Sequence, residues 1–361
     1  MSVLAPPPAM AATAKQVARR AVIRRPRPKK RVPRLRLAAG RTANPTLWMI
    51  CPDWDKPAGG LRKQYRAVDV LNEAGLSAAV VHRRPGFRCT WFEHDTRVVS
   101  AGDIAVAEGD VIAVPEIYGP SILELPAGVR QVIFNQGAYL ALDTLVSGGA
   151  GAAAPYLDNP DLAAVVVVSD DSARVVRYAF PNVPVHRIHH GIDPAIHHPP
   201  AAAPRRRIAY MTRRRSHEAA LVLRLLELRG VLDGWEVVAI HGKTELEVAE
   251  ILRSSQIFLS FSQLEGFGLP PLEALACGCL VVGFDGFGGR ELFQPPFATS
   301  IEDGDVVAYA QAVEDVIRRI DADPDAMRQA AAAGAAFALE RYSRAVERQD
   351  LLDVFAPLLA P

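Results

Sequence analysis

From residue 45 onwards the chain alternates short apolar runs with longer amphipathic stretches. The apolar runs are bounded by turn residues and are too short for helices, so they predict buried strands. In the first half these strands cover residues 47–51, 78–82, 111–114, 132–135, 164–169 and 185–189. The amphipathic stretch over 61–74, which stops at Gly75, predicts a helix after the first strand. Apolar strands separated by helices indicate a parallel sheet covered on both faces.

A second series follows a proline-rich break at residues 198–204. It predicts strands over 208–211, 236–240, 257–260 and 280–284 and helices over 217–229, 245–253, 270–276, 326–340 and 344–355. The expected fold class is α/β, with two doubly wound, Rossmann-like parallel-sheet domains facing each other across a cleft, because such sheets bind ligands beyond the carboxyl ends of their strands. The expected divisions are a basic arm (1–44), an N-terminal domain (45–198), a linker (199–204), a C-terminal domain (205–340) and a last helix (341–361).

Basic residues are concentrated at the start of the chain. Residues 1–41 contain twelve Lys and Arg and no Asp or Glu, whereas the remaining 320 residues contain 29 basic and 40 acidic side chains. This segment is rich in Ala and Pro and lacks the apolar core of a secretory signal, so we expect a disordered arm. Three roles for this arm stay open: it is only solvated, it binds the anionic inner surface of a membrane, or, in a eukaryote, it is a transit peptide. No folded basic face supports nucleic acid as a partner, and we expect none.

The remaining composition places the protein in a reducing compartment. Its four cysteines lie in apolar stretches without the spacing of a disulfide framework or a zinc site: Cys51, Cys89, Cys277 and Cys279. No uncharged apolar run is long enough to span a membrane. We therefore expect buried, reduced thiols in a cytoplasmic protein, peripheral on the inner membrane face if the basic arm binds there.

One segment of the second half carries most of the candidate chemistry. The glycine loop, residues 262–268, follows a strand and leads into a helix opened by Pro270 and Pro271. Glycine lets a backbone approach a ligand closely, and a helix N-terminus presents unpaired amides that suit a diphosphate. Glu273 is expected on the first helical turn, where its carboxylate would reach both hydroxyls of a ribose. Glu265, on the loop, would face the same ligand from the sugar side.

The complete string Glu-Gly-Phe-Gly-Leu-Pro-Pro-Leu-Glu-Ala-Leu-Ala-Cys-Gly, residues 265–278, resembles the EGFGLPxxEAxAxG signature of family 4 of the retaining glycosyltransferases, part of the glycosyl transferases group 1. In that family the two glutamates form the E-x7-E motif, matched here by Glu265 and Glu273. The resemblance implies the GT-B architecture, with the donor on the C-terminal domain, the acceptor on the N-terminal domain and the last helix crossing back. It also implies that Glu273 holds the donor ribose and that Glu265 acts at the sugar.

Other parts of the family pattern have counterparts in this chain. Gly59-Gly60 resembles the Gly-Gly loop after the family's first strand, and His190-Gly191-Ile192-Asp193 resembles its Asn-Gly-Val-Asp segment before the linker. Gly288-Gly289-Arg290-Glu291 is similar to its Gly-Gly-x-x-Glu turn, with one residue missing. The donor-binding residues that the resemblance implies in these segments and the glycine loop are Gly59, Gly60, Gly191, Phe267, Gly268 and Leu269.

Fixed positive charge is the other requirement of this chemistry, because charge builds on the leaving diphosphate during transfer. Three arginines, Arg213, Arg214 and Arg215, follow the first strand of the second domain. Arg213 matches an arginine of the family, and we assign it with Glu265 as catalytic. The family's nearby lysine has no clear counterpart, and Arg214 or Arg215 is the candidate substitute. Arginine at a helix start opposes the helix dipole, which favours a role in ligand binding.

Several polar residues leave alternatives open. His241 and Gly242 follow a strand, and they line the nucleobase pocket or form an ordinary turn. Many relatives carry a histidine near the sugar where this chain has Asn135 and Gln136, so no general base is evident, which suits retention.

Two pairs of adjacent histidines are candidates for metal ligands, His189-His190 and His197-His198. They lack a metal-ligand pattern, because adjacent side chains of a strand point to opposite faces. We expect no metal site and no cofactor.

The sequence therefore predicts a retaining, hexosyltransferase-like glycosyltransferase that moves a sugar from a nucleotide diphosphate-sugar to an acceptor. The acceptor is a glycan, a lipid-linked molecule or a small molecule, and surface glycan or polysaccharide synthesis is the expected setting. Two alternatives stay open: a nucleotide-sugar epimerase on the same fold, and a non-catalytic protein that binds sugar nucleotides.

Overall fold

The structure is a computed structural model that describes residues 30–148, 153–211 and 214–360. Residues 1–29, which hold most of the predicted basic arm, and Arg213 lie outside the described residues. From Arg31 onwards the chain forms one compact unit.

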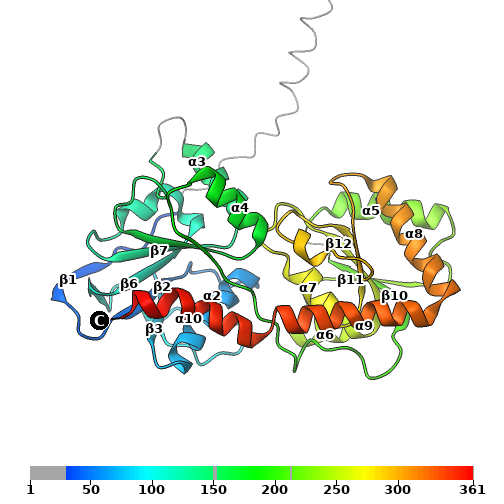
Figure 1. The fold of residues 1–361 in the computed structure, drawn as a ribbon, viewed down its shortest axis with the longest axis horizontal. Helices are drawn as coiled ribbons and strands as arrows, with labels where there is room; N and C mark the ends of the chain where they lie inside the picture. Colours follow the sequence, from blue (N-terminus) through cyan, green and yellow to red (C-terminus); the bar gives the residue numbers. More distant parts are fainter. Residues whose placement is uncertain (1–29, 149–152, 212–213, 361) are drawn as a thin grey trace, which may run out of the picture. The chain divides into compact units, whose positions relative to one another are not determined.

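Seven parallel strands form the first sheet, in the order β4-β3-β2-β6-β7-β8-β9 (Figure 1). Their bounds are β2 Thr46–Ile50, β3 Ser77–His82, β4 Val98–Ser100, β6 Val111–Pro115, β7 Arg130–Asn135, β8 Leu162–Val167 and β9 Val185–Arg187. Successive side chains of a strand point to opposite faces. Leu47 and Met49 therefore enter one core with α2 (Gly59–Glu73). Trp48 and Ile50 enter the opposite core, which is covered by η2 (Glu116–Glu124), α3 (Ala138–Gly148) and α4 (Asp170–Ala179).

Five parallel strands form the second sheet, in the order β11-β10-β12-β13-β14. Their bounds are β10 Arg205–Met211, β11 Glu236–Ile240, β12 Ser255–Phe261, β13 Leu280–Phe284 and β14 Ala298–Ser300. The covering helices are α5 Ser216–Leu228 and α8 Val306–Ala322 on one face, and α6 Glu245–Arg253, α7 Leu269–Ala276 and the end of α9 (Pro324–Arg341) on the other. A short turn of 3-10 helix, η3, covers Arg290–Leu292.

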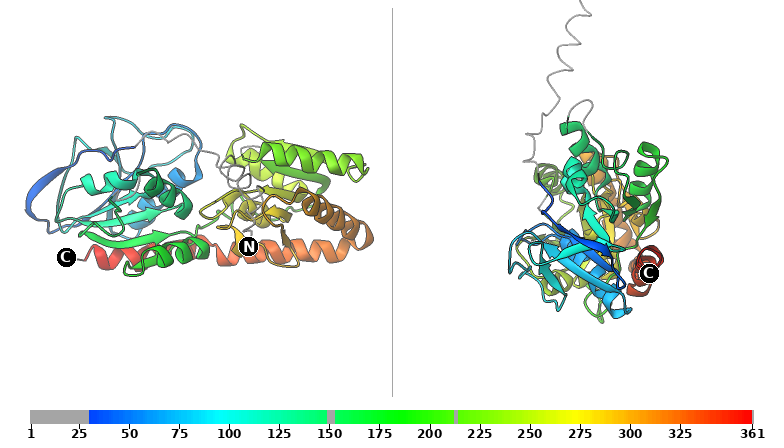
Figure 2. Two further views of the ribbon diagram at one scale, coloured as in Figure 1. Left: turned by 90° about the horizontal axis from the view of Figure 1, so that it is seen from above. Right: turned by 90° about the vertical axis from the view of Figure 1, so that its left-hand side faces the viewer.

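The last helix, α10 (Arg344–Leu358), returns to the first sheet and lies beside α2 (Figures 1 and 2). Its apolar side chains Leu351 and Phe355 share a core with the α2 face of that sheet. A buried ion pair adds to this contact, with the Lys63 Nζ atom 3.1 Å from the Glu347 Oε1 atom. Lys63 also donates a hydrogen bond to the carbonyl oxygen of Gly191. The segment before the second sheet and the last helix are thus held together at α2.

A pair of short strands corrects the expectation for the basic arm. β1 (Arg36–Arg41) pairs in parallel with β5 (Ala105–Glu108), and Val32 is buried. The arm was expected to be disordered as far as residue 44, and this is wrong for β1. Its side chains are almost all exposed, so charge and composition alone gave no sign of order. The strand is stabilised by backbone hydrogen bonds to a neighbour more than sixty residues away.

The predicted α/β architecture with two doubly wound parallel sheets is confirmed. Each predicted strand and helix is present, with ends displaced by a few residues. The short strands β4, β5 and β14 were not predicted, because three or four residues carry too little periodicity. The longer helices α3 and α8 were not predicted either. All four cysteines are buried and free, as expected. Among the described residues, no helix combines the length and the apolar character that crossing a bilayer requires.

Candidate functional site

Each of the two sheets has a point at which its strand order reverses. In the second sheet the strand order reverses between β10 and β12, and in the first sheet it reverses between β2 and β6. Ligands of doubly wound sheets bind beyond the carboxyl ends of strands at such switch points. The glycine loop (262–268) follows β12, Arg214 follows β10, and Gly59 and Gly60 open the helix that follows β2. The switch points therefore bring together three segments that the sequence singled out.

The glycine loop turns sharply into α7. Gly268 is the N-cap residue and has φ 105°, a left-handed conformation that favours glycine. Leu269 is the first residue of the helix, and the two prolines follow it. At the other end Gly278 has φ 82° and donates a hydrogen bond to the Leu275 carbonyl, so it is the C′ residue of α7.

The start of α7 offers unpaired amides. Within the described part of the chain, no hydrogen-bond acceptor is found for the backbone amides of Phe267, Gly268 or Leu269. Proline has no amide hydrogen, so the donors end there. The first turn of α7 contains no acidic residue and no side chain caps it. The helix dipole is therefore left without a negative partner at this end.

A second helix start faces the first. α2 begins at Gly59, with no side-chain cap and no acidic residue in its first turn. A methyl group at Gly59 would lie 2.6 Å from the Leu269 Cδ1 atom, so the two helix ends are in direct contact. Two uncapped N-termini that meet create a positive potential at their junction, which is a setting for a diphosphate.

Gln136 joins the two halves at the same place. Its Nε2 atom donates a hydrogen bond of 3.0 Å to the Gly60 carbonyl. The backbone carbonyl oxygen of Gln136 lies against Gly266. A Cβ atom added to Gly266 would be 1.7 Å from this oxygen, so position 266 of the loop excludes any side chain. Asn135, in contrast, is fully buried and donates to the Tyr156 hydroxyl at 2.8 Å, which is a structural role.

Glu265 lies on the loop beside Arg214. The Arg214 Nε atom is 3.2 Å from the Glu265 Oε1 atom, and Arg214 also donates to the Gln263 carbonyl at 2.6 Å. Both side chains remain partly exposed, so a ligand can reach them. Arg215 points elsewhere: it pairs with Glu218 and Asp303 and stacks 4.8 Å above the Phe284 ring. Of the two candidates for the second cation, Arg214 is the one at the loop.

Glu273 lies at the junction of the two halves. The helix begins at Leu269, so Glu273 is on the second turn and not on the first as expected. Its Oε1 atom is 3.6 Å from the Arg62 Nη2 atom of α2, and Arg62 also forms an ion pair with Glu245 of α6. Burial raises the pKa of Glu273 to about 7, although the charge of Arg62 acts in the opposite direction. The carboxylate is thus poised between its two protonation states near neutral pH.

Other predicted donor-binding residues lie away from this group. Gly191 packs against α10, where an added Cβ would be 2.7 Å from the Glu347 Oε2 atom. His241 and Gly242 are exposed on the loop between β11 and α6. This loop leads directly to Glu245, whose ion pair with Arg62 connects the loop to the site.

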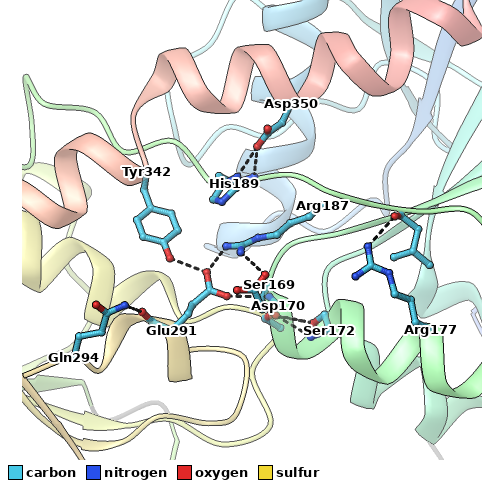
Figure 3. Close-up of polar contacts among 12 residues, drawn as sticks. Ser169, Asp170, Ser172, Arg177, Arg187, His189, Glu291, Gln294, Tyr342 and Asp350 are labelled. Carbon is cyan, nitrogen blue, oxygen red and sulfur yellow. Dashed lines mark hydrogen bonds and ion pairs between the residues drawn. The ribbon is translucent and has the colours of Figure 1, made fainter.

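Glu291, from the turn that resembles Gly-Gly-x-x-Glu, contacts residues of both halves (Figure 3). Its carboxylate accepts hydrogen bonds from Arg187, from the Tyr342 hydroxyl at 2.7 Å and from the Asp170 amide at 2.9 Å. Asp170 opens α4, whose N-cap is Ser169. These contacts connect β9, η3 and the joint between α9 and α10.

Backbone strain is concentrated around the loop. In the described chain, positive φ values at residues other than glycine occur at Arg215, Leu264 and Phe287. Leu264 and Phe287 flank Glu265, whose backbone bridges to Phe287. Such conformations cost about 1–3 kcal/mol and cluster at functional sites.

One group of side chains has the types and spacing of metal ligands within the described residues: His197, Glu245 and Glu273, with ligand atoms within 4.8 Å of one another. His197 is 2% exposed, and neither ring nitrogen has a hydrogen-bond partner among these residues. The guanidinium of Arg62 forms ion pairs with the carboxylates of Glu245 and Glu273, so it already supplies positive charge to this group. We therefore assign no metal to this group.

The unpartnered imidazole leads to a prediction. Replacing His197 by leucine is expected to raise the free energy of unfolding by about 1 kcal/mol at pH 7.5, because two buried polar atoms are removed. Burial lowers the pKa of His197 to about 4, so below pH 6.5 protonation favours the unfolded chain. The gain should therefore be about 2 kcal/mol larger at pH 5. Urea unfolding at both pH values measures it, with His198→Leu, exposed and adjacent, as the control. A loss of stability would indicate that His197 has a bonding partner.

Comparison with known proteins adds to this geometry. Residues 225–333 match the family model of the glycosyl transferases group 1. The matched segment covers less than half of the chain. It contains the glycine loop and both glutamates, so the resemblance seen in the sequence is confirmed for the part of the chain that carries the motif.

A curated relative of the group 1 segment is the alpha-1,6-glucosyltransferase of Actinobacillus pleuropneumoniae serotype 7 (strain AP76). It is 34% identical over 110 residues, which are 29% of this chain and 33% of the relative. The chain spans about a third of the length of the curated relatives it matches.

Solved structures resemble the chain over most of its length. Sucrose-phosphate synthase from Thermosynechococcus elongatus has a TM-score of 0.64 at 15% identity and covers 87% of this chain and 99% of its own. The pneumococcal O-GlcNAc transferase GtfA, in complex with UDP and GlcNAc, has a TM-score of 0.60 at 11% identity and covers 89% and 100%. At such identities the likeness shows the fold, which confirms the GT-B expectation.

Sequence reasoning missed Arg62 and Glu245, and it considered His197 only as a metal ligand. They lie far from the glycine loop in the sequence and match no part of the motif. Only their packing against Glu273 reveals them. Arg62 had one weak signal, its position directly after the Gly59-Gly60 helix start.

Proposed function

We propose that the chain is a glycosyltransferase that moves a sugar from a nucleotide diphosphate-sugar to an acceptor, with retention at the anomeric carbon. The observation that carries this proposal is the meeting of two uncapped helix N-termini at the switch points of both sheets, with Glu265 and Glu273 on either side. A diphosphate suits the helix ends, a ribose suits Glu273, and the transferred sugar suits Glu265.

The charges at the site support a role in stabilising the leaving group. Cleavage of the bond between the sugar and the phosphate leaves negative charge on the diphosphate. Arg214, held by the Gln263 carbonyl, and the free amides of residues 267–269 provide positive charge and hydrogen-bond donors for it. Arg213, the neighbour of Arg214, is assigned in this proposal to the same phosphates. With these groups the leaving phosphate itself assists the acceptor hydroxyl, and no metal is required.

The donor lies mainly on the second half in this proposal, and the acceptor on the first. The acceptor is a glycan, a lipid-linked molecule or a small molecule, and the setting is surface glycan or polysaccharide synthesis at the cytoplasmic side of a membrane. The activities of the similar proteins, an alpha-1,6-glucosyltransferase and an O-GlcNAc transferase bound to UDP and GlcNAc, support a nucleotide-sugar donor.

The first test is a thermal-shift screen of the full chain with UDP, GDP, ADP and their sugars. A nucleotide present at a hundredfold excess over its Kd stabilises the folded state by about 2.7 kcal/mol, which raises the melting temperature by several degrees. Arg214→Gln should abolish this shift. Arg205→Gln removes an exposed arginine from the opposite end of β10 and should leave it intact.

The second test follows each hit with an assay for release of the nucleotide diphosphate in the presence of EDTA. Slow hydrolysis without an acceptor, accelerated by a suitable glycan, supports the proposal. Conversion of the donor into an isomer indicates an epimerase, and binding without turnover under every acceptor indicates a non-catalytic binding protein. The absence of any shift with all three nucleotides would contradict the proposal.

A further inference from the structure

Glu273 forms an ion pair with a residue of the other half of the molecule. Among the described residues, the ion pairs of Glu273 are limited to Arg62, at 3.6 Å. Arg62 is in the first turn of α2, whose start contacts α7 through Gly59 and Leu269. Glu273, the carboxylate that suits the ribose, is therefore paired with Arg62, a cation from the half that lacks the E-x7-E motif.

The other charged groups around Glu273 do not replace Arg62. Lys63, next on α2, is engaged with Glu347 and the Gly191 carbonyl. Glu245 of α6 is a second carboxylate on the same guanidinium, and its charge opposes ionisation of Glu273. His197, before β10, is held uncharged because burial lowers its pKa to about 4.

We propose that Arg62 is a positioning residue for the donor, which from the first half keeps the Glu273 carboxylate charged and oriented toward the ribose. This inference rests on the proposed function. Its consequence is that the ribose site is competent only while the two halves are in contact, so donor binding and the contact of the halves are coupled. Arg62 acts through Glu273 and has no assigned contact with the donor.

The physical reason lies in the balance at Glu273. Burial disfavours the charged carboxylate, and a cation within about 4–6 Å lowers a carboxyl pKa by about 1–3 units. Without Arg62, a larger fraction of Glu273 is protonated at pH 7. A protonated carboxyl group accepts fewer hydrogen bonds from the two ribose hydroxyls.

The test compares wild type, Arg62→Gln and Arg62→Lys by two measurements. The first is the titration of Glu273, followed by the ¹³C resonance of its carboxyl carbon and assigned by its absence in Glu273→Gln. The midpoint should rise by about one unit or more in Arg62→Gln and stay close to wild type in Arg62→Lys. An unchanged midpoint in Arg62→Gln would overturn the proposal without any nucleotide.

The second measurement is the Kd of whichever of UDP, GDP or ADP binds, between pH 6 and pH 9. At pH 7, Arg62→Gln should weaken binding about fivefold or more, and the difference should shrink towards pH 9, as more of Glu273 becomes ionised in the variant. The double variant with Glu273→Gln should bind as Glu273→Gln does, because the effect passes through that carboxylate. Arg66→Gln, one turn along α2 and paired with Glu73, is the matched control and should bind as wild type.

The outcomes separate the two proposals. If wild type binds a nucleotide but Arg62→Gln has the same pH profile, the role of Arg62 is refuted and the proposed function stands. If Arg62→Gln binds more tightly, Arg62 competes with the ribose, which also refutes the positioning role. If wild type binds none of the three nucleotides at any pH, the proposed function fails, and the donor role of Arg62 fails with it.

Discussion

Glutamine in place of Glu265 is expected to lower the turnover number about a hundredfold while changing the Kd of the nucleotide by less than about threefold. The side chain is nearly unchanged in size, but its charge is lost. Arg214, at 3.2 Å, then loses the charge of Glu265 and keeps its hydrogen bond to the Gln263 carbonyl, so it stays at the phosphates but is placed less precisely. A misplacement of about 1 Å at a reacting centre costs about two orders of magnitude in rate.

Steady-state kinetics with the donor found in the screen, together with calorimetric binding of the free nucleotide, separate the two effects. Glu250→Gln, on the exposed side of α6, is the matched control and should keep full activity. Equal turnover in Glu265→Gln and wild type would remove Glu265 from the catalytic group. A large loss of nucleotide affinity with unchanged turnover would exchange the roles of the two glutamates.

Glutamine in place of Glu273 is expected to weaken nucleotide binding by about 10- to 100-fold. An ionised carboxylate accepts hydrogen bonds from both ribose hydroxyls, and hydrogen bonds to a charged group contribute about 1.5–3 kcal/mol. The amide keeps one acceptor oxygen and introduces a donor that cannot pair with Arg62. Calorimetry above pH 8, where the wild-type carboxylate is ionised, shows the largest difference. Equal affinity at that pH would place the ribose elsewhere.

The same variant has a second, ligand-independent signature. Folding raises the pKa of Glu273 from about 4.5 to about 7, so the folded state holds this proton more tightly than the unfolded chain. The stability of wild type therefore falls as pH rises from about 4.5 through 7, and glutamine removes this loss. Relative to wild type, Glu273→Gln should gain about 3 kcal/mol in the free energy of unfolding between pH 4.5 and pH 8. Urea unfolding at several pH values tests it, and a pH-independent difference would show that Glu273 does not titrate in this window.

The glycine loop shows how far local pattern can lead. Two glycines, two prolines and two glutamates at fixed spacing indicated a strand, a tight turn and an open helix start, and the structure has each of them. Arg214 and Arg215 show the limit of prediction from local pattern. They are adjacent at a helix start, so the sequence does not distinguish which of them binds the phosphates. The left-handed backbone of Arg215 directs its side chain to Asp303, whereas Arg214 pairs with Glu265.

Sequence by itself determined the alternation of strands and helices, the two α/β halves and the motif of the second half. These depend on period, turn residues and short-range spacing, which are properties of neighbouring residues. Tertiary structure alone decided that Gly59 meets Leu269, that Gln136 lies against Gly266 and that Arg62 pairs with Glu273. Each contact joins segments more than a hundred residues apart, where strand order and packing, and not local preference, set which side chains meet. The site is therefore a property of the fold of both halves, although its motif is written in one.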